Sequence, residues 1–151
     1  MNQVVFNTIA LLIGAVALIL FVQVFLRYVL HAPLTWSEEV AKYLSIWIVF
    51  LGMAVAMRRM LLIAVEAVVQ SVPERIGHAM RLLSLGLVMV FVGYLAYIGI
   101  GLTSGAADQD FASLELPMSI VYAAIPVGSF LTLMNAIVVF IEMIGERSVK
   151  I

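Results

Sequence analysis

The chain has 151 residues, of which 65% are hydrophobic and only 11% are charged. Soluble domains hold roughly 45–50% apolar and about 25% charged residues, so this composition excludes a sizeable aqueous domain and predicts one membrane domain over residues 1–151. The formal net charge of −1 excludes the basic surface that nucleic-acid binding requires. With no Cys, disulfides and Cys-ligated metals are excluded as well.

Four apolar segments are predicted to cross a bilayer as helices. About 20 apolar residues in a helix cover a hydrocarbon core of about 30 Å. Apolar stretches without Asp, Glu, Lys or Arg occupy residues 1–26, 43–57, 82–107 and 116–141. The predicted spans are about 4–26, 36–57, 81–102 and 117–141. The expected fold class is therefore all-α integral membrane.

The first span is predicted to be a retained helix. The Ala-Val-Ala sequence at 15–17 is similar to a signal-peptidase site, but a basic n-region is missing and the apolar run continues to residue 26. Arg27 and Tyr28 follow as an interfacial anchor. The short loop after them is expected to bring Arg27 close to Glu38 and Glu39 in the next helix.

The second span is predicted to start in a capping box. Thr35 and Glu38 have the spacing at which Thr35 accepts from the N–H of Glu38 while the Glu38 side chain reaches back. Lys42 lies four residues after Glu38, where the two side chains can pair. Together with Trp36 and Glu39, this turn is either a helix cap or a polar anchor for a partner, and the two roles can coexist.

A short helix in the membrane interface is predicted between the second and third spans. The Arg58-Arg59 pair ends the second span, and segment 60–72 would cover only about 20 Å as a helix, too little to cross. Its polar residues Glu66 and Gln70 share a narrow face with Arg59. This pattern is typical of a helix with its polar side toward water.

The fourth span contains two prolines with different expected effects. Pro117 stands in the first turn, where a helix tolerates proline. Pro126 lies inside the span and deprives the carbonyl of Tyr122 of its partner, so a kink is expected there.

Small residues recur at four-residue steps in three spans. They are Ala10/Gly14, Gly52/Ala56 and Ala124/Gly128/Thr132/Ala136. Such residues let helices approach closely, either within this chain or against a larger partner, and the sequence does not distinguish the two.

The distribution of Lys and Arg predicts the orientation. Four spans place two cations, Arg27 and Lys42, on one side of the membrane. The six on the other side are Arg58, Arg59, Arg75, Arg81, Arg147 and Lys150. Because cation-rich connections stay inside, both termini are predicted to be cytoplasmic and connection 103–116 to be outside. Its acidic residues, the candidates for docking an external partner, are Asp108, Asp110 and Glu115.

No ionisable residue lies in the middle of a predicted span, although ion and proton pathways usually need one. The most polar interior residues, Gln23 and Asn135, are of a kind that more often bonds helix to helix. His31 and His78 suggest a haem, but the predicted topology separates them by a bilayer. The chain is therefore expected to have no enzymatic, metal or cofactor site and to transport no charged solute by itself.

Two groups of residues resemble the small membrane subunit (DctQ type) of tripartite ATP-independent periplasmic (TRAP) transporters. The first is Phe25-Leu26-Arg27-Tyr28, Pro33-Leu34-Thr35-Trp36-Ser37-Glu38-Glu39, Tyr43, Trp47, Phe50-Leu51-Gly52 and Arg58-Arg59. The second is Leu116-Pro117-Met118, Tyr122 and Ile125-Pro126-Val127-Gly128. The candidate partner-interface or anchor positions are Arg27, Tyr28, Trp36, Glu38, Glu39, Lys42, Trp47, Arg58, Arg59, Pro117, Tyr122, Pro126 and Gly128.

The resemblance implies a heterodimeric complex in a bacterial inner membrane. In that family the small subunit packs against a large multi-span subunit that holds the Na⁺ and substrate sites. A periplasmic binding protein delivers an organic acid such as a C4-dicarboxylate or sialic acid. The expected function is a non-catalytic subunit of this secondary active transporter, which braces the large subunit and helps dock the binding protein. The alternative is a membrane-anchor subunit of a respiratory enzyme.

Two segments depart from the family pattern. After the Arg pair the family commonly has Gly-x-His-Ile-x-Val-Asp, whereas residues 60–66 read Met-Leu-Leu-Ile-Ala-Val-Glu. Before the fourth span the family often has Ser-Pro-Ala-Leu-Gly, whereas residues 112–115 read Ala-Ser-Leu-Glu. The outer surface is therefore expected to suit a particular binding protein.

Overall fold

The computed structural model describes residues 2–32, 34–58, 73–108 and 117–149, and almost all of these are helical. The helices are α1 (Asn2–Tyr28), α2 (Thr35–Arg58), α4 (Glu74–Gly105), α5 (Ser119–Tyr122) and α6 (Ala124–Val149). Four stretches are long and apolar enough to cross a membrane, namely Gln3–Tyr28, Thr35–Arg58, Ile76–Gly105 and Ser119–Gly145. The predicted all-α fold with four candidate spans is confirmed. The predicted interfacial helix at 60–72 lies outside the described residues.

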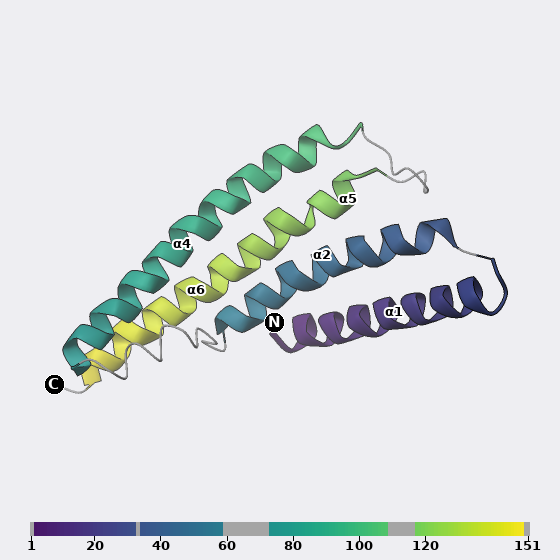
Figure 1. Ribbon diagram of the computed structural model, residues 1–151. Coiled ribbons are helices and arrows are strands. Elements are labelled where there is room, and N and C mark those ends of the chain that lie inside the picture. The colour runs from purple at the N-terminus through teal and green to yellow at the C-terminus, as the bar shows by residue number, and fades with distance from the viewer. Residues whose placement is uncertain (1, 33, 59–72, 109–116, 150–151) are drawn as a thin grey trace.

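The spans pack side by side in the order α1, α2, α6, α4 (Figure 1). Successive spans alternate in direction, so α2 and α6 run parallel to each other. We call the end with His31 and Ala106 the turn end, and the end with Arg58 and the start of α4 the terminal end. The fourth span thus lies between the second and the third.

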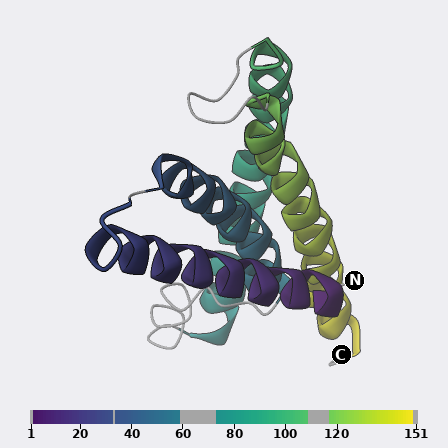
Figure 2. The ribbon, with the colours of Figure 1, turned by 90° about the vertical axis from the view of Figure 1, so that its right-hand side faces the viewer.

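Helix α1 touches α2 alone among the described helices, and in the second view it crosses in front of the other helices (Figure 2). Its less exposed positions follow a spacing of three and four residues, typical of a coiled-coil seam. They are Val5, Ile9, Leu12, Val16, Ile19, Gln23 and Leu26. The remaining faces of α1 are exposed on this chain.

Helix α4 begins at Glu74 and ends at Gly105, so it is longer than the predicted 81–102 at both ends. The carbonyl of Pro73 accepts from the N–H groups of Ile76 and Gly77 at 2.9 and 3.0 Å, which closes the first turn. The prediction took the boundary from Arg81, where the apolar stretch starts. A helix continues into the headgroup region, however, because its hydrogen bonds are internal and do not depend on hydrocarbon.

The fourth span is interrupted where the proline predicts it. Helix α5 ends at Tyr122, α6 begins at Ala124, and Ala123 lies between them in a turn. Pro126 occupies the first turn of α6, where its missing N–H costs least. The position near Tyr122 where a kink is expected thus coincides with the boundary between α5 and α6, at which Ala123 keeps helical backbone angles of φ −60° and ψ −22°.

The stripe of small residues on α6 serves contacts within this chain. Ala124, Gly128, Thr132 and Ala136 are all buried. A Cβ on Gly128 would lie only 2.5 Å from the Cβ of Phe50 in α2, so only glycine permits this approach of α2 and α6. Ala10 and Gly14 of α1, in contrast, are exposed.

Gly99 provides the matching close contact on α4. A Cβ there would lie 2.8 Å from Ile125 Cγ2 and 2.9 Å from Pro126 Cδ. Gly128 and Gly99 thus let α6 approach α2 on one side and α4 on the other. Near the terminal end, Met57 and Leu85 complete the core as part of one buried apolar cluster.

Candidate partner-contact sites

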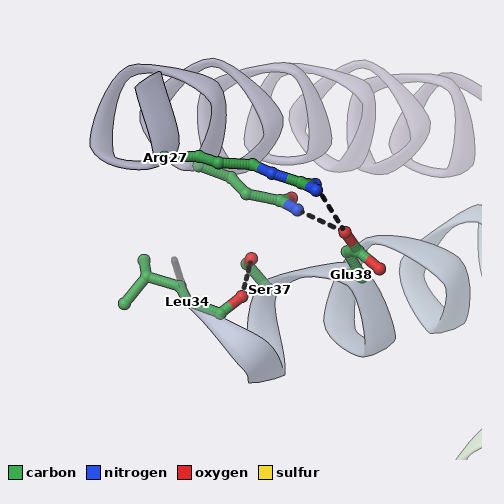
Figure 3. A network of polar contacts seen from close by, with 5 residues as sticks. Arg27, Leu34, Ser37 and Glu38 are labelled. Atoms are coloured by element: carbon green, nitrogen blue, oxygen red, sulfur yellow. Dashed lines mark hydrogen bonds and ion pairs between the residues drawn. The ribbon is translucent and has the colours of Figure 1, made fainter. Parts of the chain in front are cut away.

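Three polar residues meet at the turn end, where α1 and α2 face each other (Figure 3). Gln23 Nε2 donates to Glu38 Oε1 at 2.8 Å, and Arg27 Nη1 lies 3.9 Å from the same oxygen. We call Gln23, Arg27 and Glu38 the Glu38 cluster. The expected approach of Arg27 and Glu38 across the short loop is confirmed, and Gln23 supplies the shorter contact.

The capping-box prediction is wrong for the described part of this turn. Helix α2 already includes Thr35, and the local side-chain bond comes from buried Ser37, whose Oγ donates to the carbonyl of Leu34 at 2.8 Å (Figure 3). The carboxylate of Glu38 turns to α1 because two donors lie there. The expected pairing of Glu38 with Lys42 is likewise not found among the described residues.

The Glu38 cluster combines a buried amide with two accessible charges. Gln23 is only 7% exposed, and its Oε1 has no hydrogen-bond partner among the described residues. The side chains of Arg27 and Glu38 are 57% and 68% exposed. An exposed ion pair at 3.9 Å contributes little to stability, so both charged groups remain accessible to another molecule.

Other candidate residues surround this cluster. The guanidinium carbon of Arg27 lies 6.0 Å from the centre of the exposed Tyr28 ring, at the outer limit of a cation–π contact. Trp36 and Lys42 are also exposed, whereas Glu39 is half-buried. Of the acidic residues in the connection before α5, Asp108 is exposed at the same end. Asp110 and Glu115 lie outside the described residues.

Several of the candidate partner-interface or anchor residues contact other parts of this chain, where α2 meets α5 and α6. Trp47 Nε1 donates to the carbonyl of Ile120 at 3.2 Å, which ties α5 to α2. One turn further along, Phe50 meets Gly128. Tyr122 and Pro126 are half-buried at the junction of α5 and α6, and Pro117 is half-buried just before α5.

The same contact continues toward the terminal end through two polar pairs. Asn135 Nδ2 donates to the carbonyl of Ala54 at 2.8 Å. Arg58 Nη1 and Nη2 donate to the two carboxylate oxygens of Glu142 at 2.5 and 2.8 Å. Four contacts join α2 to the fourth span, which consists of α5 and α6, and we call them together the α2–α6 seam: Trp47–Ile120, Phe50–Gly128, Ala54–Asn135 and Arg58–Glu142. Arg59 lies outside the described residues.

Glu142 is a residue of this contact that the sequence did not mark as a candidate. The signal that would have found it is topological: in an alternating bundle the second and fourth spans end at the same membrane face. Arg58 and Glu142 each stand near the end of such a span, so opposite charges there can meet. The seven-residue spacing of Gly128, Asn135 and Glu142 places all three on one stripe of α6.

The two histidines are far apart, as the topology required. His31 follows α1 at the turn end with φ of 53°, and His78 lies in the first turns of α4 at the terminal end. They cannot ligate one iron. Within the described ranges, no group of three or more His, Asp or Glu side chains is placed to hold a metal ion.

These features define a polytopic helical membrane protein whose polar side chains lie at helix ends and helix contacts. The family model for "Tripartite ATP-independent periplasmic transporters, DctQ component" matches residues 16–146. The chain belongs to this family.

Three relatives agree with this assignment. The chain is 30% identical over 119 residues to the sialic acid TRAP transporter permease protein SiaT of Haemophilus influenzae (strain 86-028NP), a match over 79% of this chain and 19% of that protein. It is 31% identical over 100 residues to the C4-dicarboxylate TRAP transporter small permease protein DctQ of Rhodobacter capsulatus, with 65% and 44% covered. A putative TRAP transporter small permease protein of Haemophilus influenzae (strain ATCC 51907 / DSM 11121 / KW20 / Rd) is 26% identical over 114 residues, with 75% and 70% covered. The match thus spans about a fifth of the first relative and less than half of the second.

Proposed function

We propose that this chain is the small, non-catalytic permease subunit of a Na⁺-coupled TRAP transporter for an organic acid in a bacterial inner membrane. Its partners are a large multi-span subunit that carries out transport and a periplasmic binding protein. The family match over residues 16–146 is the observation that carries the proposal. Two relatives named for sialic acid and for C4-dicarboxylates support an organic acid as the substrate class.

The use of polar groups inside the spans supports an accessory role. Asn135 donates across to α2 and the Thr132 hydroxyl donates to the carbonyl of Gly128 at 2.7 Å. The first bond connects α6 to α2 and the second lies within α6, so both groups are engaged in structural contacts of this chain. Charged residues among the described spans lie at the helix ends, as with Arg58 and Glu142, whereas ion pathways place them near mid-membrane.

Two surfaces are suited to the two partners. Helix α1 is covered by α2 on one side only, which leaves an apolar membrane face for helices of the large subunit. At the turn end, the accessible charges of the Glu38 cluster and Asp108 are suited to a water-soluble binding protein. This assignment requires the turn end to face the periplasm and both termini to be cytoplasmic, as the cation distribution predicts.

Reconstitution with each component omitted in turn tests the proposal. Proteoliposomes with this chain alone should take up no organic acid under a Na⁺ gradient. Addition of the large subunit and the binding protein should produce uptake that fails when this chain is left out. Uptake by the chain alone, or full uptake in its absence, would reject the accessory role.

The alternative, a membrane anchor for a respiratory enzyme, predicts a visible-absorbing haem in the purified complex. His31 follows α1 at the turn end and His78 lies in the first turns of α4 at the terminal end, which argues against bis-histidine ligation within this chain. An absorption spectrum of the complex from its native membrane separates the two functions.

A further inference from the structure

An apolar recess of about 270 Å³ lies between α2, α4 and α6. Ala56 and Met57 of α2 form one wall, Val88 and Phe91 of α4 form the other, and Thr132 of α6 lies at the floor. The Thr132 hydroxyl is already bonded to the carbonyl of Gly128. The Thr132 hydroxyl therefore offers no free hydrogen-bonding group to a ligand. The other lining residues are apolar, so the recess favours a hydrocarbon ligand.

The recess exists because α2 and α4 both pack against α6, while the backbones of these two described helices do not approach each other closely. Small Ala56 leaves space on the α2 side, while Phe91 is 62% exposed at the rim, so the space opens to the surroundings of the bundle. Apolar cavities of roughly 150 Å³ in other proteins stay free of water and take up small hydrocarbons. A larger recess within membrane-spanning helices has the acyl chains of the bilayer as its immediate source of such hydrocarbon.

A cation stands beyond the terminal end of the recess. Arg81 lies two turns before Val88 on the same face of α4, about 10 Å away along the axis at 1.5 Å per residue. It is exposed, and it forms no ion pair with another described residue. An apolar slot inside the membrane with a cation at its surface end matches the shape and charge of a phospholipid with a negative headgroup.

The dimensions favour an acyl chain over a helix of a partner. A helix with its side chains is about 10 Å across, whereas this recess has a volume of only about 270 Å³. We propose that the recess binds one acyl chain of an anionic phospholipid from the leaflet at the terminal end, with the headgroup phosphate at Arg81. The lipid would fill the gap between α2 and α4 and fix their separation.

Lipid retention measured by native mass spectrometry tests the two halves of the site. The full chain, purified from its native membrane with its associated subunits, is equilibrated with phosphatidylglycerol or phosphatidylcholine. Wild type is expected to retain about one phosphatidylglycerol and at least fivefold less phosphatidylcholine. Arg81→Gln should lower the preference for phosphatidylglycerol at least threefold, whereas Lys42→Gln, an exposed cation at the other end, should not change it.

Filling the recess tests the acyl-chain site independently of charge. Ala56→Leu should reduce retention of both lipids severalfold, whereas Ala10→Leu on the exposed face of α1 should leave it unchanged. Equal retention in Ala56→Leu and wild type would overturn the proposal, as would unchanged lipid preference in Arg81→Gln. Circular dichroism of each variant checks that it is folded.

Photo-crosslinking in the membrane tests lipid binding at the recess a second time, without any substitution in the chain. Phosphatidylglycerol with a diazirine on its acyl chain should label peptides containing residues 53–57 and 88–92 more strongly than those of α1. Preferential labelling of α1, or no labelling at the recess because a side chain of another subunit fills it, would reject the lipid site.

Discussion

Arg58 at the end of α2 and Glu142 near the end of α6 hold the two parallel spans together through two hydrogen bonds, although they are 84 positions apart in the sequence. Bidentate guanidinium–carboxylate pairs have a fixed planar geometry, so this pair sets how far one helix can slide along the other. It closes the α2–α6 seam at the terminal end, as Trp47 closes it toward the turn end.

We expect a double-mutant cycle to show coupling between Arg58 and Glu142. Arg58→Gln and Glu142→Gln should each lower the midpoint of thermal unfolding in detergent by at most a few degrees, because both side chains are partly exposed. The double variant should lose little more than either single variant. Strictly additive losses would show that the two groups act separately. Lys42→Gln serves as the control for removing a surface charge.

Gly128 should be the most sensitive glycine of the described chain. Gly128→Ala places a Cβ 2.5 Å from Phe50 Cβ and 2.8 Å from its backbone, and overpacking of this kind costs roughly 1–3 kcal/mol. Gly86→Ala, where nothing lies within 4 Å, should be neutral or stabilise by up to about 1 kcal/mol through helix propensity. Unfolding in mixed micelles measures both, and equal stability of the two variants would contradict this close contact.

The hydrogen bond between Gln23 and Glu38 predicts that the amide and the carboxylate can be exchanged between the two positions. Gln23→Glu would place a second carboxylate against Glu38 and should destabilise by roughly 1–3 kcal/mol. Adding Glu38→Gln should restore stability, because a donor and an acceptor face each other again. Gln23→Leu should change stability by less than about 1 kcal/mol, since it loses one bond and also removes the Oε1 that has no partner among the described residues.

Arg27→Gln is the matched control for this exchange. It should have a smaller effect than Gln23→Glu, because Arg27 is more exposed and 3.9 Å from the carboxylate. Failure of the Gln23→Glu/Glu38→Gln pair to recover stability would show that the 2.8 Å bond does not connect α1 to α2 as described.

Reporter fusions should place the C-terminus in the cytoplasm and the connection 106–110 in the periplasm. The expectation follows from the excess of cations at the terminal end and from the alternating direction of the four candidate spans. Alkaline phosphatase should be active after fusion within 106–110 and inactive after Ile151, with a cytoplasmic reporter giving the reverse. The opposite pattern at both sites would invert the proposed roles of the two ends.

The sequence determined the number and approximate limits of the spans. Each needs about 20 apolar residues, and charges such as Arg27 and Arg58 stop the apolar stretches near the helix ends. The break before Pro126 was equally predictable, because a ring nitrogen without N–H removes one helical bond whatever the helix packs against. The family could also be predicted from the sequence, because its motifs are short continuous stretches such as residues 33–39.

Tertiary structure alone decided which faces of these helices meet. In a membrane both the buried and the lipid-facing side of a helix are apolar, so hydrophobic periodicity does not mark the contact face. The α6 stripe around Gly128 packs inside the chain, whereas Ala10 and Gly14 of α1 show similar spacing and remain exposed. The sequence offers several possible hydrogen-bond donors to Glu38. Because α1 packs against α2, the donor in the structure is Gln23. The pairing of Arg58 with Glu142 depends on α2 and α6 lying side by side, which no local pattern encodes.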